Sequence, residues 1–179
     1  MKNPLKRKSE SPPVMKVLGR AKSRYNDIMV TQNGDYRDLW FVRDNDFFLQ
    51  SRINSKDPQD LVLVYSKMTL GNLLFQPDPK RILIVGLGGA ALPNCLSRWY
   101  PDAWIDIVEI DGKITKIAKD FFFFRESKQC KAHEIDGRVF IQNQLGKGKY
   151  DFVILDAFKS GSIPYHLKTT EFYGEIRDI

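Results

Sequence analysis

The chain has 179 residues, of which 42% are hydrophobic, so it is long enough for one domain with a substantial core and is not a disordered composition. No apolar run approaches the length needed to cross a bilayer, so we expect no membrane partner. The two cysteines, Cys95 and Cys130, exclude a disulfide scaffold and favour a reducing, cytoplasmic location. The formal net charge of +6 is concentrated in the first 24 residues, which hold eight Lys and Arg against one Glu.

Residues 1–24 are predicted to form a basic, disordered leader. The segment contains Pro4, Pro12 and Pro13 and several serines, a composition that cannot bury enough apolar surface to fold. A basic tail can contact nucleic acid, but this one has no aromatic residue to stack on a base and no binding motif. We therefore interpret it as a solvated leader and do not expect a nucleic-acid partner.

Residues 25–56 are predicted to form a small antiparallel β-unit. The dipeptide Asn33-Gly34 lies between two β-rich segments, residues 27–30 and 39–42, and both of its residues tolerate the positive φ of a tight hairpin turn. Residues 47–50 are expected to add a third strand.

A helix is predicted from residue 57 to Pro77, with Asp57 or Asp60 as its cap. Its mostly apolar positions at helical spacing are Leu61, Val64, Tyr65, Met68, Asn72 and Phe75.

From Arg81 onward the pattern alternates between strands and helices. The expected strands are residues 82–86, 104–109, 131–135 and 152–155, and the expected helices are residues 90–100, 112–122, 138–143 and 169–179. Such alternation predicts an α/β fold, a Rossmann-like parallel sheet of the S-adenosylmethionine-methyltransferase type, over residues 57–179. A doubly wound sheet normally continues with further strands, so we expect this domain to be incomplete at its C-terminus.

Four polar or glycine-rich features follow four successive predicted strands. They are Gly86, Gly88 and Gly89 in a turn, then Glu109, then Asp136, then Asp156. Ligands of open α/β sheets bind beyond the carboxyl ends of the strands, so these residues are expected to share one site. Glycines let the backbone approach a ligand, and a carboxylate in the position of Glu109 can accept both hydroxyls of a ribose. A nucleoside site is therefore predicted.

The turn leaves two ligands open. Gly86, Gly88 and Ala91 satisfy the dinucleotide fingerprint, which would indicate NAD and an oxidoreductase. Sites for S-adenosylmethionine use a similar loop and the same ribose acid, with further polar groups at the third and fourth strands. Asp136 and Asp156 fit that second pattern. The two histidines, His133 and His166, have no zinc spacing, so no metal site is predicted. We interpret His133 as structural and His166 as a helix-start residue in preference to a pocket residue.

The order of the segments GLGGAALPN, VEID, IDG, YDFVILDA and SIPYHLKTTEFY resembles the spermidine synthase-like family, the polyamine aminopropyltransferases, over residues 25–179. The resemblance implies transfer of an aminopropyl group from decarboxylated S-adenosylmethionine to an amine, and it implies a homodimer. It further implies that Glu109 holds the ribose, that Asp136 and Gly137 hold the adenine, and that Asp156 is the base for the amine. By the same resemblance, Tyr65 and Tyr165 line the amine pocket.

Three positions depart from the family pattern. Members carry a G-G-G-D-G-G loop whose Asp binds the amino group of the nucleoside ligand, and Gly89 stands there in this chain. A family Glu is replaced by Lys67, and a second acid after the catalytic one is replaced by Lys159. Two alternatives therefore stay open: an S-adenosylmethionine-dependent methyltransferase, which uses the full amino-acid arm of the ligand, and a non-catalytic nucleoside-binding module.

Overall fold

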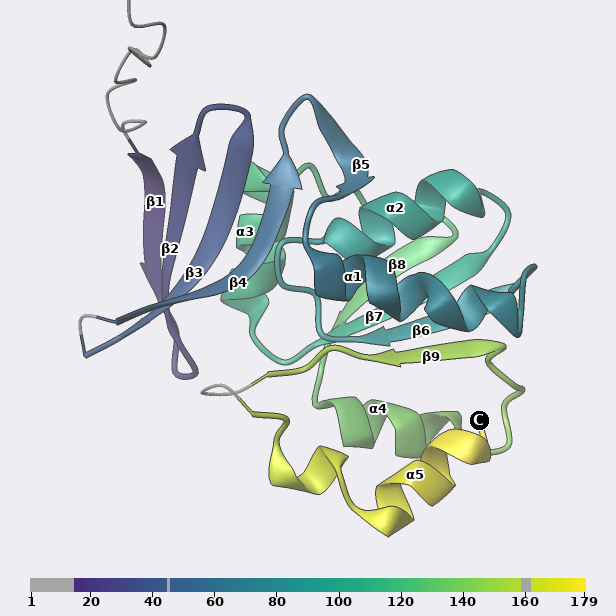
Figure 1. Ribbon diagram of the computed structural model, residues 1–179. Helices are drawn as coiled ribbons and strands as arrows, with labels where there is room; N and C mark the ends of the chain where they lie inside the picture. Colours follow the sequence, from purple (N-terminus) through teal and green to yellow (C-terminus); the bar gives the residue numbers. More distant parts are fainter. Residues whose placement is uncertain (1–14, 45, 159–161) are drawn as a thin grey trace, which may run out of the picture.

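The computed structural model describes residues 15–44, 46–158 and 162–179 and contains two sheets side by side (Figure 1). An antiparallel sheet has the strand order β1-β2-β3-β4-β5, and a parallel sheet has the order β8-β7-β6-β9. The predicted α/β fold, with a small antiparallel unit before a Rossmann-like sheet, is confirmed.

The antiparallel sheet is larger than the sequence predicts. Its strands are β1 (Lys16–Lys22), β2 (Asp27–Asn33), β3 (Tyr36–Arg43), β4 (Asp46–Asn54) and β5 (Asp57–Leu61). The Asn-Gly hairpin is confirmed: β2 and β3 pair from Asp27–Val42 to Asn33–Tyr36, and Gly34 has a φ of 57°.

The predicted leader is wrong over residues 16–22. These residues form β1, which pairs with β2 from Lys16–Gln32 to Lys22–Asp27. Leu18 and Ala21 pack against the hydrophobic core, so the strand contributes apolar contacts despite its basic composition. Residues 1–14 of the predicted leader lie outside the described residues.

The helix predicted from residue 57 is also wrong at its start, and neither Asp57 nor Asp60 caps it. Residues 57–61 form β5, in which Asp57 pairs with Asn54 and the buried Leu61 pairs with Ile53, so tertiary pairing outweighs the helical pattern. The helix α1 covers only Val64–Thr69 and is followed by the 3₁₀ helix η1 (Leu70–Leu74).

The parallel sheet agrees with the predicted elements to within about two residues, the usual uncertainty of helix and strand ends. Its strands are β6 (Arg81–Val85), β7 (Trp104–Glu109), β8 (Cys130–Glu134) and β9 (Phe152–Leu155). The helices are α2 (Ala91–Trp99), α3 (Gly112–Phe121), α4 (Gly137–Gln144) and α5 (Thr170–Arg177), and the 3₁₀ helix η2 covers Tyr165–Leu167.

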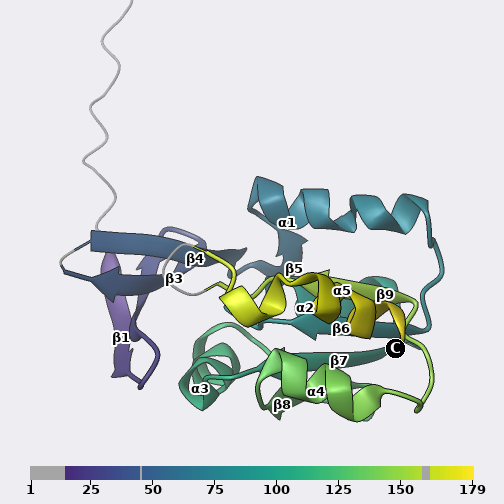
Figure 2. The same cartoon turned by 90° about the horizontal axis from the view of Figure 1, so that it is seen from below.

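The helices cover both faces of this sheet. Ile82 and Ile84 of β6 join one core cluster with α2, α3 and the antiparallel sheet, while Leu83 and Val85 join a second cluster with α4 and α5. Helices α4 and α5 lie side by side across that second face (Figure 2). Residues 82–85 of β6 are buried, so the first polar or glycine-rich feature of this strand lies in the turn that follows it.

Candidate functional site

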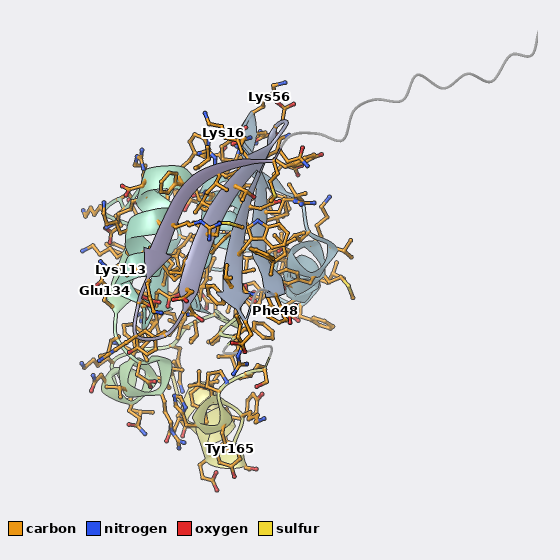
Figure 3. The ribbon with its side chains drawn as sticks, turned by 90° about the vertical axis from the view of Figure 1, so that its left-hand side faces the viewer. Lys16, Phe48, Lys56, Lys113, Glu134 and Tyr165 are labelled. Carbon is orange, nitrogen blue, oxygen red and sulfur yellow. The ribbon has the colours of Figure 1, made fainter. Side chains whose placement is uncertain are left out.

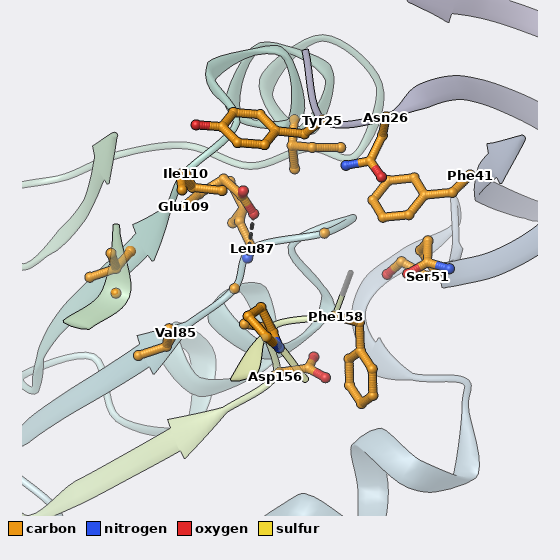
Figure 4. Close-up of a pocket in the computed structure, with 18 of the residues that line it drawn as sticks. Tyr25, Asn26, Phe41, Ser51, Val85, Leu87, Glu109, Ile110, Asp156 and Phe158 are labelled. Atoms are coloured by element: carbon orange, nitrogen blue, oxygen red, sulfur yellow. Dashed lines mark hydrogen bonds between the residues drawn. The ribbon is translucent and has the colours of Figure 1, made fainter. Parts of the chain in front are cut away.

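A cavity of about 810 Å³ lies where the carboxyl ends of the parallel strands meet the antiparallel sheet (Figure 4). Its volume is in the range of small-molecule sites. The cavity brings together all the residues predicted for the site except Gly89. The predicted residues that line it are Tyr65, Gly86, Gly88, Glu109, Asp136, Gly137, Asp156 and Tyr165.

The turn after β6 requires glycine at its first position. Gly86 has a φ of 108°, and a Cβ there would lie 2.3 Å from the backbone oxygen of Asp156. Its N–H donates to the Val108 carbonyl oxygen at 2.8 Å. Gly88 also has a positive φ, of 52°. The glycines thus let β6, β7 and β9 end close together, with the backbone of the turn facing the cavity.

Gly89 has a packing role that the sequence did not indicate. It is buried, it is not part of the cavity lining, and a Cβ there would lie 2.7 Å from Ser51 Oγ and 2.9 Å from Phe122 Cδ1. Ser51 is itself buried on β4. Ser51 of β4 therefore packs against the turn at Gly89, the position where the family pattern has an aspartate. A longer side chain at this position would require β4 to move.

We expect Gly89→Ala to lower the free energy of unfolding by about 1–3 kcal/mol, because the added methyl group overpacks the contact with Ser51 and Phe122. Urea denaturation measures the change. Gly71→Ala is the matched control, because a Cβ at Gly71 meets nothing within 4 Å. Equal stability of Gly89→Ala and the parent chain would contradict this packing account.

Glu109 ends β7 and is held by the backbone on both sides. Its Oε2 accepts from the Leu87 N–H at 3.1 Å (Figure 4), and its Oε1 accepts from the Asp111 N–H at 2.9 Å. Desolvation raises the pKa of Glu109, and the two backbone hydrogen bonds partly oppose that rise. Each carboxylate oxygen keeps a further lone pair, so the fixed carboxylate can still accept from a ligand's hydroxyls.

Asp136 has two structural partners as well as a position in the cavity wall. Its Oδ1 caps α4 by accepting from the N–H groups of Arg138 and Val139. Its Oδ2 lies 2.9 Å from Nε2 of His166. The following residue, Gly137, is packed closely, since a Cβ there would lie 2.6 Å from Val85 Cγ1.

His166 is the clearest residue that the sequence interpretation underrated. It belongs to the short helix η2, as expected of a helix-start residue, but it also lines the cavity and pairs with Asp136. His133 has the structural role expected of it: its Nε2 lies 2.7 Å from Asp106 Oδ1 and its ring packs on Phe140.

Asp156 follows β9 and points into the cavity beside the ring of Phe158 (Figure 4). Desolvation raises the pKa of this half-buried carboxyl to about 6. Tyr65 of α1 lies close enough for the charge of Asp156 to raise the pKa of its phenol, after desolvation, which has the larger effect. The Tyr65 hydroxyl donates to the Gln50 carbonyl oxygen at 3.2 Å. A carboxylate with a pKa near neutrality can accept a proton from an incoming nucleophile.

The remaining wall of the cavity has no signal in the sequence. That wall comes from the antiparallel sheet, including the turn between β1 and β2, together with Phe158. It is rich in aromatic side chains: Tyr25, Phe41, Phe47, Phe48 and Phe158. Figure 3 shows Phe48 at the end of the antiparallel sheet that faces the C-terminal segment, and Tyr165 on that segment. Such a wall depends on how the two sheets dock, which no local pattern encodes.

Within residues 15–44, 46–158 and 162–179, no group of three or more His, Cys, Asp and Glu side chains is arranged to hold a metal ion. Over the same ranges, no helix combines the length and the apolar character needed to span a bilayer.

Comparison with known proteins gives one consistent family. Residues 63–179 match the family described as the spermine/spermidine synthase domain. A protein of Vibrio vulnificus named polyamine aminopropyltransferase is 42% identical over 166 residues, which cover 91% of this chain and 55% of that protein. This chain therefore spans about half the length of that relative.

Solved structures share the fold. The crystal structure of a probable spermidine synthase from Corynebacterium glutamicum matches with a TM-score of 0.77 and 20% identity, over 89% of this chain and 59% of that one. Human methyltransferase-like protein 13, solved in complex with SAH, matches with a TM-score of 0.60 and 27% identity, over 66% of this chain and 60% of that one. On the match to residues 63–179 and to the Vibrio relative, the chain belongs to the spermine/spermidine synthase family.

Proposed function

We propose that this chain binds decarboxylated S-adenosylmethionine and transfers its aminopropyl group to an amine. The name of the Vibrio vulnificus relative, polyamine aminopropyltransferase, supports the type of group transferred. The observation that carries the proposal is the position of Asp156. Its carboxylate, with a pKa raised to about 6, points into a cavity that is also lined by the glycine turn and by Glu109, the acid proposed to bind a ribose.

The nucleoside is assigned to the side of the cavity formed by β6, β7 and β8. Glu109 accepts from the ribose hydroxyls, since its carboxylate is fixed by the N–H groups of Leu87 and Asp111. Asp136 and Gly137 lie one strand further and are assigned to the adenine. Because His166 already bonds Asp136, the adenine amino group shares that carboxylate with the imidazole.

The reaction needs little from the protein beyond placement and a base. The lone pair of the amine attacks the carbon attached to the sulfonium, a C–N bond forms, and the C–S bond breaks with its electrons moving to sulfur. The products are the alkylated amine and the neutral thioether 5′-methylthioadenosine. The amine loses one proton, which Asp156 accepts, and the site holds nitrogen, carbon and sulfur in line.

A second candidate is methyl transfer from S-adenosylmethionine. Two observations favour it: Gly89 stands where the family is expected to carry an aspartate, and the human methyltransferase-like protein was solved in complex with SAH. With glycine at position 89, the turn has no carboxylate to attract the amino group of decarboxylated S-adenosylmethionine. The turn also has no carboxylate to repel the carboxylate of S-adenosylmethionine.

Product analysis separates the two reactions. The chain is incubated with an amine mixture and either decarboxylated S-adenosylmethionine or S-adenosylmethionine, and the nucleoside products are identified by mass spectrometry. We expect 5′-methylthioadenosine from the first ligand. Formation of S-adenosylhomocysteine from the second, without 5′-methylthioadenosine from the first, would replace aminopropyl transfer by methyl transfer. Binding of nucleoside without either product would contradict both reactions and leave a binding module.

A further inference from the structure

Asp136 receives hydrogen bonds on both of its carboxylate oxygens before any ligand binds. Its Oδ1 accepts from the N–H groups of Arg138 and Val139 at the start of α4, at 2.9 and 3.2 Å. Its Oδ2 lies 2.9 Å from Nε2 of His166. An ionised aspartate has no proton to donate, so the imidazole is the donor of this bond. Each oxygen has two lone pairs, so one lone pair of Oδ2 is left once these described partners are counted.

His166 is held in place by its backbone as well as by its ring. Its carbonyl oxygen accepts from Nη1 of Arg138 at 3.3 Å, and Arg138 is fixed in turn by two bonds to the carboxylate of Glu175, at 2.9 and 2.8 Å. The next residue, Leu167, is buried in the second core cluster with α4 and α5. The short helix η2 lies against α4 (Figure 1). The imidazole therefore reaches Asp136 from a segment that is anchored to α4.

Both members of this pair belong to the lining of the cavity. Their side chains stay partly exposed, at 27% for Asp136 and 46% for His166, so a ligand in the cavity can reach the remaining acceptor position of Oδ2. The cap of α4 holds Oδ1. Because the torsion about the Cβ–Cγ bond of an aspartate is broad, a second partner is needed to fix the direction of Oδ2, and His166 is that partner.

From this geometry we propose that His166 is a positioning residue for base recognition, which fixes Oδ2 of Asp136 so that the nucleoside site selects a 6-aminopurine over a 6-oxopurine. The proposal rests on the proposed function, because it places the adenine at Asp136. The amino group of adenine donates to the remaining lone pair of Oδ2. A 6-oxopurine presents an oxygen at that point, and a fixed carboxylate does not turn to the neighbouring N1–H, so the two oxygens repel each other.

Equilibrium binding of two nucleosides that differ only in the base tests this role without depending on turnover. The full chain and its His166→Leu variant are titrated by calorimetry with 5′-methylthioadenosine and with 5′-methylthioinosine. We expect the parent chain to prefer the adenosine by about a hundredfold. In His166→Leu this preference is expected to fall about tenfold, because the carboxylate of Asp136 loses its second partner and can turn toward N1–H.

The ratio of the two affinities separates positioning from a merely structural role. A variant that only loosened η2 would weaken both nucleosides equally. An unchanged ratio in His166→Leu, or equal binding of the two nucleosides by the parent chain, therefore overturns the proposal. His166→Gln is expected to restore most of the preference, because its amide N–H can replace the Nε2–H as the donor to Asp136. If His166→Gln behaves like His166→Leu, a donor at this position does not set the preference and the proposal is overturned.

His133 supplies the matched control. Its Nε2 lies 2.7 Å from Oδ1 of Asp106, and neither residue is part of the described cavity lining. His133→Leu therefore removes a histidine–aspartate bond of the same kind at a distance from the base, and it is expected to leave both affinities within about twofold. An equal loss of preference in His133→Leu and His166→Leu would mean that the effect is not specific to Asp136, and it would overturn the proposal.

The two proposals fail in different ways. If the preference falls in His166→Leu but no 5′-methylthioadenosine forms from decarboxylated S-adenosylmethionine, the role of His166 stands and aminopropyl transfer falls. If 5′-methylthioadenosine forms and the ratio of affinities does not change in His166→Leu, aminopropyl transfer stands and the role of His166 falls. If the parent chain binds neither nucleoside, the nucleoside site falls and both proposals fall with it.

Discussion

Asp156→Asn is expected to lower turnover by about a thousandfold while the affinity for 5′-methylthioadenosine stays within about twofold. The amide has nearly the size of the carboxylate but cannot accept the proton of the attacking amine. Nucleoside binding is preserved because Glu109 and Asp136, on other strands, are assigned to the nucleoside. Product formation and calorimetry on the same preparation measure the two quantities.

The pH dependence follows from the same carboxyl. Desolvation raises the pKa of Asp156 to about 6, so the basic form that turnover requires is lost as the pH falls through about 6. We expect kcat/KM of the parent chain to fall tenfold per pH unit below this value. A profile that is flat down to pH 5 would contradict the assignment of Asp156 as the base.

The stability of the Asp156→Asn variant moves in the opposite direction to its activity. Because the pKa of Asp156 is higher in the folded chain than its ordinary value of 3.8, the folded state binds the proton more tightly, and stability is lost as the pH rises from about 4 to about 6. At pH 7.5 the buried charge costs up to about 3 kcal/mol, which the neutral amide removes. Asp156→Asn is therefore expected to unfold at higher urea concentration than the parent at pH 7.5, and at a similar concentration at pH 4.

Asp120→Asn is the control for that measurement. Asp120 is exposed and pairs with Lys116 on the surface of α3, so its substitution is expected to change stability by less than about 0.5 kcal/mol at either pH. If Asp156→Asn is less stable than the parent at pH 7.5, the carboxylate makes a favourable contact that the desolvation argument omits.

Glu109→Gln is expected to weaken nucleoside binding by about a hundredfold, the second large effect. In the proposed complex the substitution removes the charged acceptor of the ribose hydroxyls, and a hydrogen bond with one charged partner contributes about 1.5–3 kcal/mol. The amide group of Gln also has to face the N–H of either Leu87 or Asp111, so one of the bonds that fix the side chain is lost. Calorimetric titration with 5′-methylthioadenosine measures the change.

Glu134→Gln provides the matched control for Glu109→Gln. Glu134 is the register partner of Glu109 on β8, but it is exposed and lies outside the cavity lining. Its substitution is expected to leave the affinity unchanged. Burial raises the pKa of Glu109, so nucleoside affinity should also weaken on acidification. Equal affinities of the two variants would show that Glu109 does not hold the ribose.

The sequence predicted the parallel sheet closely because each of its elements is specified locally. Strand β6 is a continuous apolar run, and Asp111 and Asp136 cap the helices that follow their strands. Strands β1 and β5 were missed because pairing with β2 and β4 creates them. Their own residues are basic in one case and rich in Asp and Pro in the other.

The candidate site could be predicted only on the side that strand ends define. Glu109 ends a strand, Asp136 and Asp156 each come just after one, and parallel strands bring such residues to one edge of the sheet. The pairing of His166 with Asp136 joins residues 30 positions apart, and the aromatic wall belongs to a different sheet. Neither feature has a periodic signature, because each depends on the way separate elements dock.

The central claim is that Gly86, Glu109 and Asp136 form a site for an S-adenosylmethionine-type nucleoside. Calorimetric titration of the full chain with 5′-methylthioadenosine and with NAD tests this claim most directly. The account predicts one molecule of 5′-methylthioadenosine bound per chain, loss of most of that affinity in Glu109→Gln, and no binding of NAD. Binding of NAD in preference to 5′-methylthioadenosine, or binding of neither ligand, would contradict it.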